Sequence, residues 1–358
     1  MGHGPPRATV APPAGVCSSA PIPRGRVGAH RVTAAAASAR LADAVAALRR
    51  GEVIGLPTET VYGLAADASN AAAVRKIFAL KGRPADHPLI VHLASTAQLS
   101  SWARDIPDGA RALAAAFWPG PLTLILPRQP MVLDAVTGGQ DTVGLRCPAH
   151  PLARQLLDAF DGGVAAPSAN RFGRISPTKA SHVRDEFGDA VPIVLDGGDC
   201  EVGIESTIVA FVGSTPRILR PGRITQAQIE AVIGPVLLGS GQDSPRASGT
   251  LEAHYAPRTP MLLLSRAALE AEASQQAALG KHVRALVLGA LPAGTRGQVL
   301  PADAHAYAHG LYAAMRALDN DGSHLLLVEQ PPQGGDWLAV HDRLRRAAAG
   351  AEPGDDSP

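Results

Sequence analysis

The basic side chains best suited to bind an anion are Lys81, Arg83 and His87, in the sequence KGRPADHP. The two prolines of this stretch stop the preceding helical segment, so the basic groups emerge on a stiffened loop. Arginine offers a planar fork to two phosphate oxygens, and lysine adds a compact charge. A solvated basic turn explains the same pattern, since its ion pairs would be worth only about 0 to 1 kcal/mol each. Taken alone, the loop favours the solvated turn.

The hydroxyl groups of Thr58 and Thr60 form a second candidate site, directly after an apolar segment at residues 53–57. Loops at strand ends are where α/β sheets bind small ligands. Threonine hydroxyls can bind a carboxylate, a hydroxyl or a phosphate, and Gly63 would let the backbone pass close to a ligand. An ordinary Ser/Thr turn at the end of a strand accounts for these residues equally well. Both interpretations stay open at this point.

Helical and extended segments alternate along the chain, which is the pattern of an α/β protein. In the first part we expect helices at residues 39–50, 72–80, 109–117, 151–160, 179–187 and 225–232. We expect strands at residues 53–57, 89–93, 122–126, 143–146, 164–166, 193–195, 207–211 and 218–219. These elements predict one α/β domain over residues 38–234.

A second, smaller α/β domain is predicted at residues 261–349, after a linker at 235–260 whose middle is rich in Gly and Ser. Its expected strands are 261–264, 285–288 and 325–328, and its expected helices are 267–279, 304–318 and 337–349. The tails at 1–37 and 350–358 are predicted to be disordered. The Arg-rich N-terminal tail also faintly resembles a transit peptide, but its prolines argue against an amphipathic targeting helix.

Composition and charge limit the classes of function. Hydrophobic residues make up 46% of the chain and charged residues 18%, which is typical of a globular protein. Lys and Arg (33) nearly balance Asp and Glu (32), so any nucleic acid would need a local basic patch. No apolar run reaches the roughly 18 to 20 residues that span a bilayer, so we expect no membrane role. The three cysteines, Cys17, Cys147 and Cys200, form no CxxC pair, which predicts a reducing compartment, the cytoplasm.

Common nucleotide-binding and catalytic motifs are absent from the sequence. GxxxxGK[ST] does not occur, and the glycine pairs at 138–139 and 197–198 lack a strand-to-helix context, so neither a P-loop nor a Rossmann dinucleotide site is predicted. Ser206 has no evident His and acid partners, and Cys147 is expected to fill an apolar slot. No Cys or His spacing predicts a protein-bound transition metal. Phosphates would then be held mainly by side chains and scattered backbone amides.

The order of the motifs overturns the solvated-turn interpretation. LPTETVYGL at 56–64 and KGRPADHPLIVH at 81–92 are followed by WPGPLT at 118–123, TVGLRCP at 142–148, APSAN at 166–170, SPT at 176–178, GIEST at 203–207 and LRPG at 219–222. Together they resemble the YrdC-like fold over nearly the whole first domain. Ser248-Gly249 and the HYAP sequence at 254–257 resemble the linker of the long family members. The family implied is L-threonylcarbamoyladenylate synthase, in its long two-domain form.

The resemblance implies a fold and a set of site residues. The YrdC-like domain would be a twisted mixed sheet with flanking helices, and the C-terminal accessory domain a Rossmann-like open α/β sheet. Threonine is expected to lie against Thr60, His92, Arg146 and Ser206. ATP is expected to lie against Arg83, His87, Thr142, Ser168, Ser176, Arg220 and Tyr255. Candidates for electrostatic catalysis are Lys81, Arg83 and Arg220. A Pro-rich tether between the domains is the alternative for the Tyr255 segment.

The reaction implied by the family joins L-threonine, bicarbonate and ATP. Threonine and bicarbonate give an N-carboxy species, whose carboxylate attacks the α-phosphorus of ATP and expels pyrophosphate. We expect Mg²⁺ to accompany ATP, with no metal held by protein side chains. Downstream tRNA threonylcarbamoyl-transfer enzymes would use the product to modify the adenosine next to the anticodon, and direct tRNA contact is expected to be weak at most.

Two alternatives belong to other functional classes. A YrdC-like RNA-binding module without adenylate synthesis fits less well, because the net charge is +1 and aromatic residues make up only 4% of the chain. A carbamoyl-transfer maturation protein would carry acylphosphatase and Cys-rich metal modules, which this sequence lacks. The synthase is therefore the function that we expect.

Overall fold

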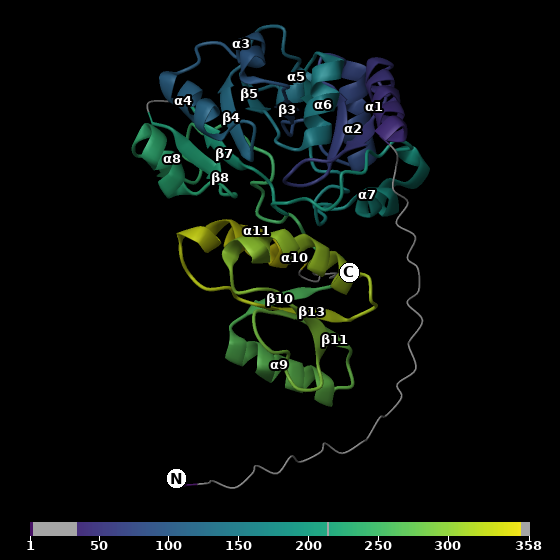
Figure 1. Ribbon diagram of the computed structural model, residues 1–358, viewed down its shortest axis with the longest axis vertical. Coiled ribbons are helices and arrows are strands. Elements are labelled where there is room, and N and C mark those ends of the chain that lie inside the picture. Colours follow the sequence, from purple (N-terminus) through teal and green to yellow (C-terminus); the bar gives the residue numbers. More distant parts are fainter. Residues whose placement is uncertain (3–33, 213–214, 352–358) are drawn as a thin grey trace, which may run out of the picture.

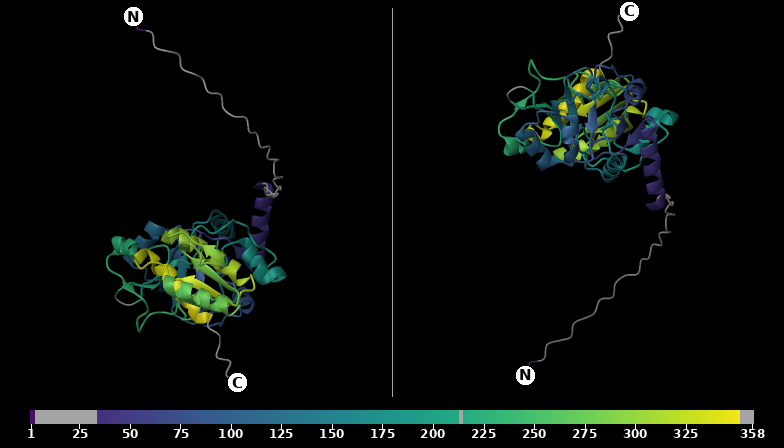
Figure 2. Two further views of the ribbon diagram at one scale, coloured as in Figure 1. Left: turned by 90° about the horizontal axis from the view of Figure 1, so that it is seen from below. Right: turned by 90° about the horizontal axis from the view of Figure 1, so that it is seen from above.

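The protein folds into a larger α/β body, which contains the N-terminal part of the chain, and a smaller C-terminal α/β body (Figure 1). The computed structural model describes residues 1–2, 34–212 and 215–351 of the 358-residue chain. Most of the two predicted tails, residues 3–33 and 352–358, lies outside the described residues. Figure 2 shows the same two bodies from below and from above.

The larger sheet, within the described residues, has nine strands in the order β1-β2-β6-β3-β5-β4-β7-β8-β9. The strands are β1 Ile54–Leu56, β2 Gly63–Asp67, β3 Ile90–His92, β4 Leu122–Pro127, β5 Thr142–Arg146, β6 Val164–Ala165, β7 Thr207–Ala210, β8 Arg217–Arg220 and β9 Leu237–Leu238. β3 pairs with β5, β4 with β7 and β8 with β9 in parallel, and the other neighbours are antiparallel. The predicted mixed sheet is confirmed.

Helices pack around this sheet and connect its strands (Figure 1). They are α1 Ala34–Arg49, α2 Ala71–Lys81, α3 Leu99–Trp102, α4 Asp108–Phe117, α5 Asp134–Thr137, α6 Pro151–Phe160, α7 Ala180–Phe187 and α8 Gln226–Ile233. The main core includes fully buried Leu64, Ile77, Leu113, Leu124 and Val183, from strands and helices alike. Burial of each such side chain stabilises the fold by roughly 1.5 to 3 kcal/mol.

Helix α2 ends where the basic loop begins. The side chain of Asn70 caps its start by accepting two backbone N–H bonds, and Gly82 ends it in the left-handed conformation with a φ of 62°. The apolar face of α2 packs into the core, and Lys81 lies on that face. Lys81 and Arg83 are only 2% and 8% exposed. The end of the helix therefore directs both cations into the protein, and the solvated-turn interpretation is wrong.

The C-terminal body is a four-stranded parallel sheet in the order β10-β13-β11-β12. Its strands are β10 Met261–Leu264, β11 Val283–Val287, β12 Arg296–Val299 and β13 Leu325–Glu329, and its helices are α9 Arg266–Ala278, α10 Ala304–Asp319 and α11 Leu338–Gly350. α9 covers one face, while α10 and α11 lie on the other, between the small sheet and the larger body (Figure 1). This arrangement confirms the predicted open α/β domain.

The two bodies share one hydrophobic cluster. Val61, Ile175 and Ile204 of the first body pack in the same cluster as Leu311 and Leu344, which lie on α10 and α11. The linker adds its own buried side chains to this cluster. Since the cluster continues across the boundary, α10 and α11 form part of the wall on which the loops of the larger sheet rest.

Three local predictions differ from the structure. The strand expected at 193–195 is a single bridge between Gly55 and Val194, because Pro192 has no N–H to donate to a neighbouring strand. β2 was not among the expected strands, because its alanine-rich sequence has low strand propensity; its pairing with β1 outweighs that propensity. The short strands β9 and β12 were also missed, since each lies at a sheet edge and carries no buried apolar pattern.

Gly203 lies against α10 at the boundary between the two bodies. It adopts a φ of +79°, and a Cβ placed there would be 2.5 Å from the carbonyl oxygen of Ala308. Beside it, the Nδ1 atom of His309 lies 3.0 Å from the carbonyl oxygen of Glu201. Only glycine allows this close backbone approach without strain.

We predict that Gly203→Ala destabilises the protein more than Gly234→Ala does. Gly234 has a similar φ of +77° but open space at its Cβ position, so its substitution reports backbone strain alone. That strain costs about 1 to 2 kcal/mol. Gly203→Ala should lose at least about 2 kcal/mol more, because the helix backbone must move. Urea unfolding measures both losses, and equal losses would contradict the close packing of this loop on α10.

Candidate active site

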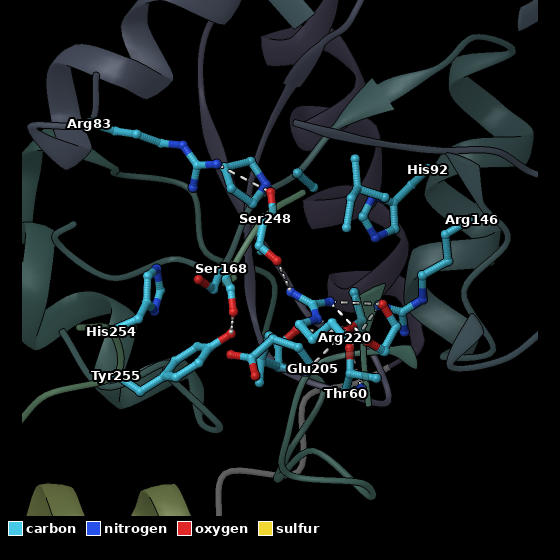
Figure 3. A pocket seen from close by; sticks show the side chains of 18 residues that line it. Thr60, Arg83, His92, Arg146, Ser168, Glu205, Arg220, Ser248, His254 and Tyr255 are labelled. Atoms are coloured by element: carbon cyan, nitrogen blue, oxygen red, sulfur yellow. Dashed lines mark hydrogen bonds between the residues drawn. The ribbon is translucent and has the colours of Figure 1, made fainter. Parts of the chain in front are cut away.

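A pocket lies where loops from one edge of the larger sheet meet the linker between the two bodies (Figure 3). The empty space inside it is about 520 Å³, with solvent at its mouth included. The residues that line it are Thr58, Thr60, Val61, Gly63, Arg83, Ile90, His92, Arg146, Ala166, Pro167, Ser168, Glu205, Ser206, Arg220, Ser248, Gly249, His254 and Tyr255. A polar, cationic wall of this kind suits an anionic ligand.

Strand pairing brings His92 and Arg146 together. They are the last residues of β3 and β5, and the parallel register of these strands places one opposite the other. The two side chains are 3% and 4% exposed. Parallel pairing thus places an imidazole and a guanidinium side by side at the ends of two neighbouring strands.

The guanidinium of Arg146 is partly satisfied by its neighbours. It donates from Nε to the carbonyl of Gly120 at 3.2 Å, from Nη1 to Thr60 Oγ1 at 2.8 Å and from Nη2 to Glu59 Oε1 at 2.6 Å. Arginine has five N–H donors. Within the described residues three of them are used, so one donor remains on each Nη atom. A carboxylate is the group that accepts two such donors.

The loop between β1 and β2 forms a hydroxyl-lined turn. Thr58 Oγ1 and Thr60 Oγ1 lie 2.8 Å apart and share a hydrogen bond. Thr58 Oγ1 also donates to the carbonyl of Val61 at 2.6 Å. This is the Ser/Thr turn that the sequence left open, and it has a further effect because it holds Thr60 against Arg146. The turn interpretation is confirmed, and ligand binding by Thr60 stays a prediction.

The imidazole of His92 is held in its neutral form. Burial, and then the charge of Arg146, lowers the pKa of His92 to about 3. Its Nδ1 atom is buried and has no hydrogen-bond partner among the described residues. A neutral ring with a buried, unpaired nitrogen can accept or donate one hydrogen bond to a ligand.

Ser206 and Arg220 lie beside each other where β7 begins and β8 ends. Ser206 directly precedes β7, and Arg220 ends β8. Arg220 donates from Nε and Nη2 to the Ser206 carbonyl at 3.1 and 3.0 Å, and Nη2 also lies 3.1 Å from Ser206 Oγ. Ser206 Oγ shares a 2.8 Å hydrogen bond with Thr123 Oγ1. The serine hydroxyl is thus fixed between a cation and a second hydroxyl.

Arg83 and Arg220 both reach Ser248 of the linker. Arg83 Nη2 donates to Ser248 Oγ at 3.2 Å, and Arg220 Nη1 donates to the Ser248 carbonyl at 2.9 Å. The Nε atom of Arg83 is buried and has no partner in the described part of the chain. Two oxygens of one linker residue therefore bridge two guanidinium groups, as two oxygens of a phosphate could.

Tyr255 forms the linker side of the pocket. It adopts a φ of +63°, which is unusual for a bulky residue. Its ring stacks on Tyr312 of α10 at a centroid distance of 5.8 Å, and the guanidinium of Arg343 lies 5.3 Å from the ring centre. His254 packs against the same ring at 4.2 Å. The C-terminal body therefore holds the linker in this strained conformation.

The buried cations carry charges that the protein only partly neutralises. Burial lowers the pKa of Arg83 to about 10, and it lowers the pKa of Arg220 and of Lys81 as well. Lys81 donates from Nζ to the carbonyls of Ser168 and Asn170 at 2.5 and 2.6 Å. An anionic ligand would relieve these desolvated charges.

Eight of the site residues that we predicted from the sequence line the pocket, namely Thr60, Arg83, His92, Arg146, Ser168, Ser206, Arg220 and Tyr255. Four others lie outside its lining. Lys81 anchors the loop that carries Ser168, and Ser176 donates to Glu205 Oε1. His87 packs its ring on Phe172 at 5.2 Å, and Thr142 lies at the far end of β5. Their direct roles in binding stay predictions, and the geometry favours supporting roles for Lys81 and Ser176.

Three residues of the site were not proposed from the sequence. Glu59 pairs with Arg146, Ser248 bridges Arg83 and Arg220, and Glu205 is an acidic group on the pocket wall. Both glutamates lie inside motifs that were recognised. Each glutamate directly precedes a residue that we predicted to bind a substrate, and each lies in a mostly apolar segment. That position could have indicated that both belong to the site. Ser248 lies in the linker segment that the resemblance included, but nothing in its type or spacing indicated that it would contact two arginines.

Three properties of the described residues bear on other kinds of site. They contain no group of three or more His, Cys, Asp or Glu side chains placed to hold a metal ion. None of their helices has both the length and the apolar character to cross a membrane. Cys147 and Cys200 are free and buried, and burial raises the pKa of the Cys147 thiol to about 11. A thiolate nucleophile is therefore not available at Cys147 near neutral pH.

Family models match both bodies of the chain. A model described as "Telomere recombination", and named for Sua5, YciO and YrdC, matches residues 46–222. A model described as "Threonylcarbamoyl-AMP synthase, C-terminal domain" matches residues 224–349.

Curated proteins and solved structures resemble the chain over most of its length. The threonylcarbamoyl-AMP synthase of Pyrococcus abyssi is 39% identical over 312 residues, which is 84% of this chain and 92% of that protein. The threonylcarbamoyl-AMP synthase of Bacillus subtilis is 40% identical over 328 residues, or 87% and 93% of the two chains. The crystal structure of P. abyssi Sua5 complexed with L-threonine matches with a TM-score of 0.83 and 38% identity, covering 87% of this chain and 94% of that one.

We predict that His92 makes the fold acid-sensitive. Its pKa is about 3 in the folded protein and about 6.5 in an unfolded chain, so acid protonates the unfolded state first. Above about pH 6.5 His92 is neutral in both states and does not lower the free energy of unfolding. As the pH drops from 6.5 toward 3, protonation of the unfolded state lowers this free energy progressively. Between pH 7.5 and 5.5 the wild type should lose about 1.4 kcal/mol more stability than His92→Asn.

Chemical unfolding at the two pH values measures this difference. His305→Asn, at an exposed histidine of α10, controls for the loss of an imidazole elsewhere in the chain. If His92→Asn and the wild type lose the same stability, His92 is not held neutral in the fold.

Proposed function

This chain belongs to the threonylcarbamoyl-AMP synthase family, in its long two-domain form, and we propose that the pocket at the linker is its active site. The enzyme is a nucleotidyltransferase that uses ATP and L-threonine and makes threonylcarbamoyl-AMP. One observation carries the assignment of the site: the pocket has two chemically different ends (Figure 3). Thr60, His92 and Arg146 lie at one end, and Arg83 lies toward the other.

The threonine site that we propose is the end formed by β3, β5 and the β1–β2 turn. The two remaining N–H donors of Arg146 would bind the amino-acid carboxylate. The neutral ring of His92 would bind a polar group of the substrate without repelling an ammonium group. Ser206, fixed by Arg220 and Thr123, would face the carbamoyl end of the substrate.

The ATP site that we propose extends from Arg220 toward Arg83, Ser168 and Tyr255. Ser248 now offers two oxygens to the two guanidinium groups, so phosphate oxygens can take the same places once the linker residue moves. The unpaired Nε of Arg83 gives a further donor for a phosphate. Binding a triphosphate here would also offset the desolvation that lowers the pKa of Arg83.

The proposed chemistry is adenylation by positioning and charge neutralisation. N-carboxythreonine forms from threonine and bicarbonate with loss of water. One of its carboxylate oxygens then bonds to the α-phosphorus, the bond from that phosphorus to the bridging oxygen breaks, and pyrophosphate leaves. Arg220 contacts Ser206 on the threonine side and Ser248 on the phosphate side, so it lies at the junction of the two substrates. Arg83 would then stabilise charge on the departing pyrophosphate.

Magnesium fits this site only as a partner of ATP. The carboxylate of Glu205 receives hydrogen bonds on both of its oxygens, and Glu59 is paired with Arg146. The described pocket wall offers no free carboxylate, so Mg²⁺ would be held by phosphates and water, as this ion commonly is in nucleotide sites. When bound, it would add charge neutralisation on the phosphate oxygens.

Events after the reaction are part of the same proposal. The acyl adenylate would pass to tRNA threonylcarbamoyl-transfer enzymes, which attach the threonylcarbamoyl group to the adenosine next to the anticodon. Near-balanced charge supports only weak direct contact between this chain and tRNA. No observation in the structure favours the alternative of an RNA-binding module.

We expect the purified protein to release pyrophosphate when given ATP, Mg²⁺, bicarbonate and threonine together. Omitting threonine should abolish the release, because the nucleophile is formed from the amino acid. Mass spectrometry of the reaction should detect threonylcarbamoyl-AMP. A protein that shows no threonine-dependent pyrophosphate release with all components present would refute the synthase activity.

Arg146→Ala should weaken threonine binding more than ATP binding. Losing a charge-assisted fork costs on the order of 1.5 to 3 kcal/mol, or about 10-fold to 150-fold in Kd. Calorimetric titrations with each substrate give the two affinities. The double variant with Glu59→Gln removes the unpaired carboxylate that Arg146→Ala would leave, so threonine affinity should remain low in it. Equal losses for both substrates in a folded protein would reject the carboxylate role.

A further inference from the structure

Glu205 is the one acidic side chain among the described residues that line the pocket. It is 6% exposed and directly precedes Ser206. A buried negative charge beside the site of a polyanion is unfavourable, since unit charges attract or repel strongly away from bulk water. Its presence on the wall therefore needs a physical explanation.

The carboxylate of Glu205 is held by donors from both domains. Ser176 of the larger body donates to Oε1 at 2.5 Å. Tyr312 of α10 donates to Oε2 at 2.9 Å, and Arg343 of α11 donates to the same oxygen at 2.8 Å. Tyr312 and Arg343 are 0% and 1% exposed. Two of the three donors thus belong to a domain that contributes no side chain to the pocket lining described above.

Arg343 also contacts the backbone of the two segments that carry Ser206 and Arg220. It donates from Nη2 to the carbonyl of Glu205 at 3.4 Å and from Nη1 to the carbonyl of Pro221 at 3.0 Å. These two residues are the direct neighbours of Ser206 and Arg220. One guanidinium therefore fixes the two segments that present the serine and the arginine to the pocket.

A second contact of α10 reaches the segment before Ser176. Arg316 donates to the carbonyls of Ile175 and Ser176, the latter at 3.3 Å, and pairs with Glu186 at 3.3 Å. The hydroxyl of Ser176 then points to Glu205. The C-terminal domain therefore contacts the loop that carries Ser176 as well as the carboxylate of Glu205.

The charge of Glu205 is maintained by its surroundings. Burial alone would raise its pKa, but the charges of Arg343 and Arg220 and the hydrogen bond from Ser176 lower the pKa to about 2. The titratable groups that face it are Arg343 on α11, Tyr312 on α10, Arg220 on β8, His254 and Tyr255 in the linker, and Lys81 at the end of α2. Arg343 also pairs with Asp342 at 2.7 Å, and Asp342 keeps a second cation, Arg346 at 2.9 Å, when Arg343 is replaced. Glu205 is thus ionised at neutral pH, and its neutralisation falls mainly to Arg343.

We propose that Glu205 is a positioning residue through which the C-terminal domain supports ATP binding: Arg343 and Tyr312 neutralise and orient its carboxylate, which in turn fixes Ser176 and the segment of Ser206. The proposal rests on the assignment of this pocket as the active site. Without Arg343, the carboxylate would face the phosphates unpaired, and Ser206 and Arg220 would lose their common anchor.

The decisive experiment compares three variants of the full-length protein in steady-state pyrophosphate release. Arg343→Met should raise KM for ATP about 30-fold, a figure that assumes a separation on the order of 8 Å between the unpaired carboxylate and the nearest phosphate charge and an effective dielectric constant near 20. The double variant Glu205→Gln with Arg343→Met should recover most of that loss, because the unpaired charge is gone. Arg284→Met is the matched control, since Arg284 pairs with Asp321 elsewhere in the same domain. It should leave KM unchanged.

A pH series separates charge from packing. In Arg343→Met the pKa of Glu205 should rise, so the ratio of KM for ATP in the variant to that in the wild type should fall as the pH is lowered from 8 to 5.5. The ratio cancels the titration of ATP itself. A ratio that stays constant, or a double variant as impaired as the single one, would show that Arg343 acts only as packing and would overturn the proposal.

Two further measurements keep the outcomes distinct. If Arg343→Met does not fold by thermal unfolding, Tyr312→Phe replaces it, since that change removes one hydrogen bond to Glu205 and keeps the ring. KM for ATP should then rise about threefold to tenfold, and an unchanged KM would overturn the proposal. Failure of the wild type to make threonylcarbamoyl-AMP would instead count against the proposed function.

Discussion

Buried cations are the constraint on which the rest of this structure depends. Arg83, Arg146 and Arg220 are each less than 10% exposed, and each needs oxygens around it to remain charged. The backbone carbonyls of Gly120, Pro88, Ser206 and Ser248 and the hydroxyls of nearby Ser and Thr residues supply those oxygens. The loops at this edge of the sheet place their carbonyl and hydroxyl oxygens against the guanidinium groups. The N–H donors that these oxygens leave unpaired are the ones that can bind an anionic ligand.

Sheet topology explains how the cations reach one place. β3 and β5 are parallel neighbours, so their last residues lie side by side. β7 and β8 are antiparallel, which brings Ser206, just before β7, next to the end of β8. Helix α2 then adds Arg83 from outside the sheet, after its glycine cap.

None of the described residues of the C-terminal domain lines the pocket, yet helices α10 and α11 contact the residues behind its wall. Tyr312 and Arg343 contact both Glu205 and the strained linker residue Tyr255. The left-handed backbone of Tyr255 persists because these aromatic and cationic contacts compensate for its strain. Because the C-terminal domain contacts both residues, a movement of the linker at Tyr255 can be transmitted to Glu205 on the pocket wall.

The sequence by itself determined the family, the two α/β domains and eight of the residues that line the pocket, because ordered motifs and the periodicity of helices and strands are local properties. It did not reveal that Lys81 points inward, since the direction of a helix end depends on how the helix packs. It also could not pair Glu205 with Arg343, because 138 residues separate them in the chain. Only the tertiary structure decided which buried charges neutralise each other, and such partners are chosen by the packing of whole domains.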